Sequence, residues 1–134
     1  MRIRGTEPIP TQLDYEQLAR EAAKALDDAK GLEVTILHLG TISSFADYFV
    51  IATADNPIHL RALTDRVRER MAQIGAKISG AEGRESKTWV LLDYGPILIH
   101  LFSRKARVYY GLEQLWGDSK VIPWNEPPIL ASTE

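Results

Sequence analysis

The strongest constraint on the fold is the segment Tyr48–Thr53, in which apolar residues follow one another without alternation. A strand with one face in water alternates apolar and polar side chains, because successive side chains point to opposite faces. A strand buried on both faces has no need to alternate. The segment therefore predicts a central strand with both faces buried, and a chain of 134 residues is long enough to bury it within one domain.

Two helices are expected on either side of this strand in the sequence. Apolar residues at helical spacing predict a first helix over residues 13–29, with a capping-box pattern at Thr11–Asp14. Asn56 and Pro57 are typical of the N-cap and the first turn of a second helix, which we expect to end at Gly75. The apolar stripe of this second helix is Leu60, Leu63, Val67, Met71 and Ile74.

The remaining pattern predicts an α/β domain with a mixed sheet of about five strands flanked by helices. Asp93–Pro96 is a turn signal between two apolar runs and indicates a hairpin. A loop is expected over residues 80–87, and residues 1–10 and 123–134 are expected to form a flexible arm and an extended tail around a domain at 11–122. Strands are predicted at 34–39, 77–79 (short, at an edge), 88–93 and 97–102, and short helices at 104–110 and 112–116.

Composition excludes several classes of function. The chain has no cysteine, which excludes disulfides and thiolate metal sites. The formal charge of -2 provides no overall positive field for nucleic acid, so no direct sequence-specific nucleic-acid contact is expected. No apolar run reaches the roughly 18 residues of a membrane span, and no apolar signal segment follows Met1. We therefore expect a cytoplasmic protein without a membrane partner.

Motifs for catalysis, metal binding and phosphate binding are weak or missing. There is no nucleophile elbow, no glycine-rich phosphate loop and no paired-histidine zinc motif. His38 and His100 fall in predicted strands, where we expect hydrogen-bonded structural roles, and His59 falls in the first turn of the second helix, where a contact role is favoured. The sequence thus indicates no enzyme, no metal and no cofactor.

One enzymatic alternative is left open by Ser43–Asp47, which faintly resembles the Gly-Ser and Asp-x-Asp layout of nucleotidyltransferases. Those enzymes hold two metal ions with carboxylates on neighbouring strands. Here the glycine is missing and Phe49 stands where the second acid belongs, although Asp93 could supply a distant carboxylate.

Binding chemistry is concentrated in the second half of the chain, where tryptophan, tyrosine and arginine lie close to acids. These residue types dominate interface hot spots. Trp89, Leu91 and Asp93 should share one face of their strand, and such a face cannot be entirely core. The alternative is that Trp89 and Trp116 only complete the core. The candidate partner-binding residues are Glu82, Arg84, Glu85, Trp89, Asp93, Tyr94, Arg107, Tyr110, Glu113 and Trp116.

Several ordered motifs resemble the ribosomal silencing factors, also called the Iojap family. The likeness covers about residues 14–122, and no single motif would be specific. The matching segments are Asp47–Thr53 (D-x-F-V-I-A-T), His59 with Ala62 and Asp65, Glu82-Gly83, Trp89–Gly95 (W-x-x-x-D-x-G), Ile99–Phe102 (V-H-x-F) and Arg107–Trp116 (R-x-x-Y-x-L-E-x-L-W).

This resemblance implies a nucleotidyltransferase-like sheet without the catalytic residues, and a protein that often forms homodimers. It implies binding to the large ribosomal subunit through ribosomal protein fourteen, which blocks the small subunit and represses translation when nutrients are scarce. Under this hypothesis Trp89 and Tyr110 anchor the contact, and Glu82, Asp93 and Glu113 pair with basic side chains of the partner. The alternative is a divergent nucleotide-binding protein.

Two departures from the family pattern affect this expectation. Pro96 stands where the family often has an aspartate, which removes a charge and rigidifies the turn. Ile58 stands where an arginine usually precedes the helix histidine, so any contact made by that arginine is lost.

Overall fold

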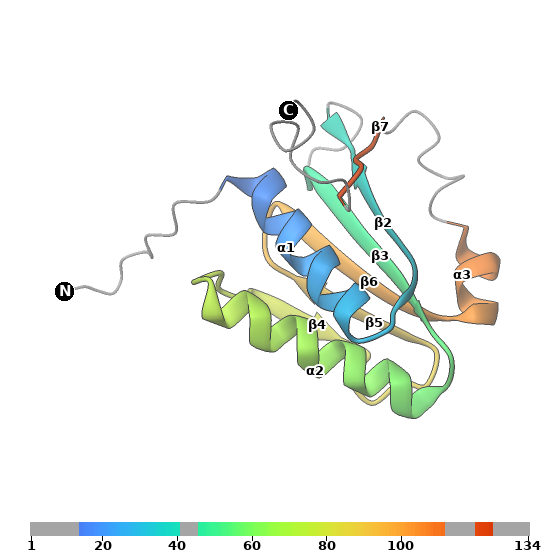
Figure 1. Cartoon of the computed structure of the whole chain (residues 1–134). Helices are drawn as coiled ribbons and strands as arrows, with labels where there is room; N and C mark the ends of the chain where they lie inside the picture. Colours follow the sequence, from blue (N-terminus) through green and yellow to red (C-terminus); the bar gives the residue numbers. More distant parts are fainter. Residues whose placement is uncertain (1–13, 41–45, 112–119, 125–134) are drawn as a thin grey trace, which may run out of the picture.

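The computed structural model describes residues 14–40, 46–111 and 120–124. They form a mixed six-stranded sheet in the order β4-β5-β6-β3-β2-β7, flanked by helices (Figure 1). The α/β class with a mixed sheet is confirmed. In chain order the elements are α1 (Tyr15–Asp28), β2 (Leu32–His38), β3 (Tyr48–Ala54), α2 (Pro57–Gln73), β4 (Gly80–Glu82), β5 (Trp89–Asp93), β6 (Ile97–Ser103), α3 (Arg104–Tyr110) and β7 (Lys120–Val121).

Strand β3 is the centre of the sheet, as the segment without alternation predicts. All seven of its residues are buried. It pairs in parallel with β6, from Tyr48 opposite Ile97 to Ala54 opposite Ser103, and antiparallel with β2 on its other side. One parallel pair among antiparallel pairs makes the sheet mixed.

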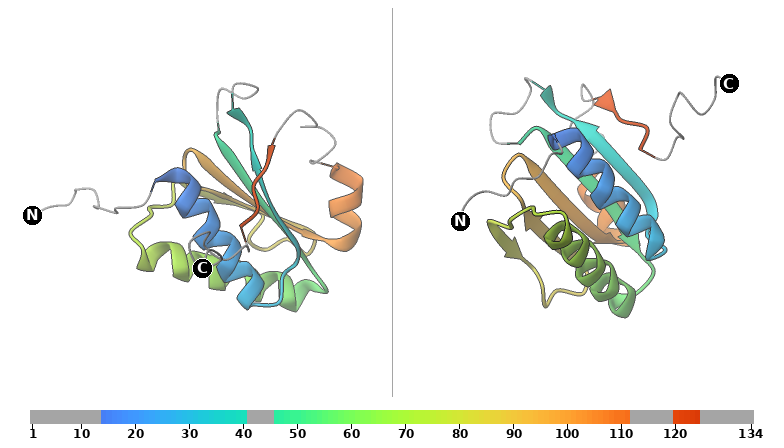
Figure 2. Two further views of the ribbon diagram at one scale, coloured as in Figure 1. Left: turned by 45° about the horizontal axis from the view of Figure 1, so that its top comes forward. Right: turned by 60° about the vertical axis from the view of Figure 1, so that its left-hand side comes forward.

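The two faces of the sheet are covered differently. Helices α1 and α2 lie side by side over one face and bury the larger core, which includes Leu26, Leu63 and Val50. Helix α3 lies on the other side of the sheet (Figure 2), where Ala106 joins a smaller cluster with Phe102. Because α3 has only seven residues, it covers a limited part of that second face.

Both long helices begin at polar caps. The predicted second cap is confirmed, since the Asn56 side chain accepts from the His59 amide and Pro57 opens α2. The first cap differs by one turn, because Asp14 is itself the N-cap of α1 and forms a capping box with Gln17. The glutamine supplies the return bond to the Asp14 amide that the box requires at its third position.

The predicted edge strand at residues 77–79 is wrong, and so is the loop at 80–82. The edge strand is β4, where Glu82 lies opposite Leu91 and Gly80 opposite Asp93 of β5. Glycine and charge made residues 80–82 resemble a loop, but pairing to β5 outweighs this weak local preference. The β5–β6 hairpin is confirmed, with Gly95 at φ 82° in its turn.

At residues 120–121, inside the predicted domain at 11–122, the chain adds a sixth strand that was not predicted from the sequence. Strand β7 pairs antiparallel with the edge of β2. After it, Ile122 is buried and the Trp124 indole donates to the Val34 carbonyl at 3.0 Å. The predicted helix at residues 112–116 and the predicted arm at 1–10 lie outside the described residues. None of the described helices is both long and apolar enough to span a membrane.

Candidate partner-binding face

Strand β5 directs two predicted contact residues, Trp89 and Asp93, away from α1 and α2. Its residues alternate between half-buried and buried, so that Trp89, Leu91 and Asp93 lie on one face and Val90 and Leu92 on the other. The buried pair belongs to the larger core under the two long helices. The predicted division of this strand is therefore confirmed. We call the side of the sheet that carries Trp89 the open face.

An aromatic cluster occupies the open face at the start of β5. The Trp89 ring stacks on His100 and Phe102 of β6, with centroids 6.3 Å away in both cases. The ring centroid of Tyr110, at the end of α3, lies 5.7 Å from those of both Trp89 and Phe102. Trp89 is half-buried and Tyr110 is 49% exposed, so the cluster is partly core and partly surface. Offset aromatic pairs of this kind give a rigid apolar patch.

His100 is the most buried polar member of this cluster. The Trp89 indole donates to its Nδ1 at 3.4 Å, which leaves the hydrogen on Nε2. Within the part of the chain that the structure describes, Nε2 is buried without a hydrogen-bond partner. Burial lowers the pKa of His100 to about 4, so the ring is neutral at neutral pH. His100 was expected to be a hydrogen-bonded structural histidine. Among the described residues, only its Nδ1 forms a hydrogen bond.

Asp93 lies at the opposite end of β5, about 13 Å from Trp89 at the usual rise of a strand. One of its carboxylate oxygens accepts from the Gly95 amide at 2.7 Å and so holds the hairpin turn. Leu98 stands opposite Asp93 on β6 and is half-buried. Leu98 was not among the predicted contact residues, although its alternation with His100 and Phe102 places it on the same face.

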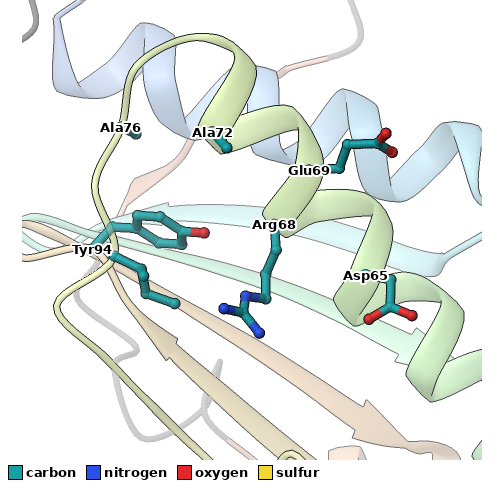
Figure 3. A pocket seen from close by; sticks show the side chains of 7 residues that line it. Asp65, Arg68, Glu69, Ala72, Ala76 and Tyr94 are labelled. Carbon is teal, nitrogen blue, oxygen red and sulfur yellow. The ribbon is translucent and has the colours of Figure 1, made fainter.

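Tyr94 is not on the open face. It packs against the larger core beside α2, where Arg68 reaches from the helix toward the strands between Tyr94 and Asp65 (Figure 3). Burial raises the pKa of the Tyr94 hydroxyl, with Arg68 acting against this shift. Adjacent residues of an extended chain point to opposite faces, so Asp93 and Tyr94 cannot contact one flat partner together.

Arg107 is not presented to a partner either. Its side chain is buried, and the guanidinium donates to Thr53 Oγ1 at 3.0 Å and to Thr35 Oγ1 at 3.2 Å. It therefore attaches α3 to β3 and β2. Arginine is rarely buried, so the residue type alone favoured the surface.

The predicted acidic and basic side chains before β5 are exposed. Glu82 faces the same side as Leu91, since residues directly opposite in a pair share a face. Arg84 and Glu85 occupy the two corners of a turn closed by the Ser86 amide donating to the Gly83 carbonyl at 2.8 Å. The Ser86 hydroxyl accepts from the Trp89 amide at 3.1 Å, which ties this turn to the aromatic cluster. Glu113 and Trp116 lie outside the described residues.

The described residues hold no group of three His, Asp or Glu side chains that could bind a metal ion. Asp47 precedes β3 and Asp93 ends β5, and β6 lies between these strands. The His59 ring forms two hydrogen bonds to the backbone of this chain. Its Nδ1 accepts from the Asp55 amide and its Nε2 donates to the Ala29 carbonyl, both at 2.9 Å. Its contact is thus with the end of α1 within the chain.

The described residues thus form a small α/β domain whose open sheet face carries aromatic and acidic side chains. Residues 12–134 match the family model described as "Ribosomal silencing factor during starvation". A ribosomal silencing factor of Zymomonas mobilis is 37% identical over 107 residues, covering 80% of each chain. That of Halalkalibacterium halodurans is 34% identical over 110 residues, covering 82% of this chain and 94% of the relative.

Solved structures agree with this match. A crystal structure of a Chromobacterium violaceum protein superposes with a TM-score of 0.76 at 32% identity, covering 78% of this chain and 88% of the other. A Bacillus halodurans protein gives a TM-score of 0.71 at 30% identity, covering 81% and 98%. The chain belongs to the ribosomal silencing factor family.

Proposed function

We propose that this chain binds the large ribosomal subunit at ribosomal protein fourteen and thereby keeps the small subunit from joining. The observation that carries the proposal is the half-exposed Trp89–Tyr110 cluster on the open face, with Asp93 and Glu82 on the same side. The mechanism is steric exclusion by a bound domain, without turnover and without a cofactor. It acts in the cytoplasm and represses translation during nutrient limitation.

The composition of this face supports a basic protein partner. Trp89 and Tyr110 offer a rigid apolar anchor, and rigid aromatic anchors carry much of the energy in protein interfaces. Glu82, opposite Leu91, and Asp93, at the far end of β5, lie on the same face as this anchor. They would meet basic side chains of the partner, which favours association and sets the orientation. A standard interface of about 800 Å² per partner could include both ends of β5. A homodimer, as the resemblance implies, is part of the proposal and is tested by sedimentation equilibrium.

Co-sedimentation with purified large subunits tests the proposal directly. We expect the protein to sediment with large subunits in equal amounts, and added small subunits to form fewer joined ribosomes. The mechanism requires both results, because steric exclusion acts only through the bound protein. A folded protein that stays in the supernatant would contradict the proposal.

Two substitutions separate the contact surface from the fold. Trp89→Ala should weaken subunit binding by about 2 kcal/mol or more, which is typical of a central aromatic anchor. Asp93→Asn is the sharper charge test, because an amide oxygen can still accept from the Gly95 amide and preserve the turn. Asp27→Asn removes an equal charge from an exposed site in α1 and should leave binding unchanged. Equal binding of the Asp93 and Asp27 variants would remove Asp93 from the interface.

A further inference from the structure

A second surface, separate from the open face, lies between α2 and the turn after β4. It is a groove of about 930 Å³. Arg61 and Arg68 enter it from α2, and Arg84 enters it from the turn. The groove floor includes the small residues Ala81 and Gly83, which leave room above the backbone. Three guanidinium groups from two separate elements thus line one depression.

Among the described residues, no ion pair neutralises these arginines. Asp65 and Glu85 also line the groove, but among the described residues no ion pair joins either acid to any of the three arginines. Arg20, Arg70 and Arg104, in contrast, each form an ion pair with an acid. The groove therefore presents guanidinium groups that no described carboxylate pairs with, exposed at Arg61 and Arg84 and half-buried at Arg68. Such groups match the oxygens of phosphate in a two-bond geometry.

The spacing of the charges favours an extended polyanion. Arg61 and Arg68 are seven residues apart on one helix, or about 10 Å along its axis. Along a nucleic-acid strand, phosphates recur about every 3.4 Å of helix axis, so this distance spans several phosphates. The residues that line the groove include no aromatic side chain on which a base could stack. The chemistry thus suits the backbone of a nucleic acid and does not distinguish sequences.

We propose that this groove binds the phosphodiester backbone of ribosomal RNA as a second contact with the large subunit. The inference rests on the proposed function, because a net charge of -2 gives no general attraction to RNA. The turn that carries Arg84 is attached to the aromatic cluster through the Ser86–Trp89 hydrogen bond, so the groove adjoins the edge of the open face. For a large subunit bound at the open face, RNA beside this edge would meet the local arginines, which would then add affinity. Recognition by arginine is independent of pH in the neutral range.

The test is the salt dependence of binding to large subunits for matched arginine variants. Arg61→Gln and Arg68→Gln should each weaken binding about tenfold at about 100 mM salt, and should each reduce the slope of log affinity against log salt by about 0.7–0.9. Arg66→Gln is the control, since Arg66 is exposed on the other flank of α2, where it faces α1. Arg66→Gln changes the net charge by the same amount, and it should leave both the affinity and the salt slope unchanged. Asp65→Asn should strengthen binding.

The outcomes separate the two proposals. If the unaltered protein fails to sediment with large subunits at any salt concentration, the proposed function fails and this inference fails with it. If it sediments but the Arg61 and Arg68 variants behave like the Arg66 variant, the inference alone is overturned.

A second measurement identifies the occupant of the groove. Ultraviolet cross-linking of the bound protein should attach nucleotides to peptides containing residues 61–68 or 81–86. Loss of binding in the arginine variants without such cross-links would overturn the assignment in favour of an acidic protein segment. Calorimetric binding of ATP that disappears in Arg68→Gln would overturn it in favour of a nucleotide site.

Discussion

At the residue scale, His100 is the described titratable group whose pKa burial shifts most strongly. Its ring is buried beside Phe49 and Phe102, with ring-centroid distances of 4.6 Å and 5.9 Å. The Trp89 indole donates a hydrogen bond to its Nδ1. Protonation would place a positive charge in this apolar surrounding, which is why the pKa falls to about 4 from an ordinary 6.5. The aromatic cluster that we propose as the partner-binding anchor therefore contains a neutral imidazole at neutral pH.

We predict that the protein loses stability as the pH falls from about 6.5 toward 4. In this range the unfolded chain binds the His100 proton and the folded chain does not, so the free energy of unfolding rises with pH. The expected contribution is about 2–3 kcal/mol between pH 7.5 and 4.5, measured by urea denaturation at several pH values. His100→Phe should remove this part of the slope.

The control for this prediction is His38→Gln, at a half-buried histidine that stacks on Tyr48. This variant also removes one histidine, but it should keep the slope. Identical pH profiles for the unaltered protein and the His100 variant would show that His100 does not govern acid stability.

At the scale of the elements, the turn between β4 and β5 depends on a glycine that no other residue can replace without strain. Gly83 has φ 77°, and a Cβ there would lie 2.3 Å from the Trp89 carbonyl oxygen. Only glycine allows the backbone of the turn to approach β5 so closely. This approach fixes where Arg84 and Glu85 project, beside both the groove and the aromatic cluster.

Gly83→Ala should therefore destabilise the protein by about 1–3 kcal/mol, because the backbone conformation is strained for alanine and the added carbon collides with a neighbouring strand. It should also weaken subunit binding, since Arg84 and Glu85 must move. Gly80→Ala is the matched control, because no atom lies within 4 Å of a Cβ there. Thermal unfolding compares the two variants, and equal stability would show that the turn can relax without cost.

At the scale of the whole molecule, the two described tryptophans serve different parts of the sheet. Trp89 stands on the open face, whereas Trp124 packs against the larger core and bonds to the Val34 carbonyl. Arg20 of α1 donates to the Pro123 carbonyl at 2.8 Å beside it. These contacts attach the chain after β7 to the first helix and to the β2 edge of the sheet.

We predict that truncating Trp124 mainly lowers stability and that truncating Trp89 mainly lowers subunit affinity. Trp124→Ala should lower the free energy of unfolding by about 2 kcal/mol, because it removes packing and leaves a carbonyl without its donor. The folded variant should still bind large subunits. Trp89→Ala should lower subunit affinity with a smaller loss of stability. Urea denaturation together with co-sedimentation makes the comparison, and loss of binding in the Trp124 variant at full folding would place the partner surface elsewhere.

Several features of this protein follow from local sequence alone. The segment Tyr48–Thr53 specified a buried central strand, and the alternation in Trp89–Asp93 divided that strand between core and open face. Asn56 with Pro57 marked the start of α2, and Asp93–Pro96 marked the hairpin. Periodicity, caps and turn residues act over a few neighbouring residues, so they can be recognised without knowing the fold.

Other features depended on contacts between distant segments. Because it pairs with β5, the edge strand lies at Gly80–Glu82 and not at 77–79. Hydrogen bonds to threonines on two strands hold the Arg107 side chain in the interior. The groove required α2 and the β4–β5 turn to approach each other, and no local pattern records that Arg61 and Arg84 share a surface. Local sequence therefore determined the central strand, the β5–β6 hairpin, the start of α2 and the buried side of β5, but not the edge strands β4 and β7. The tertiary structure decided which charged residues are exposed together, because long-range pairing energies set those positions.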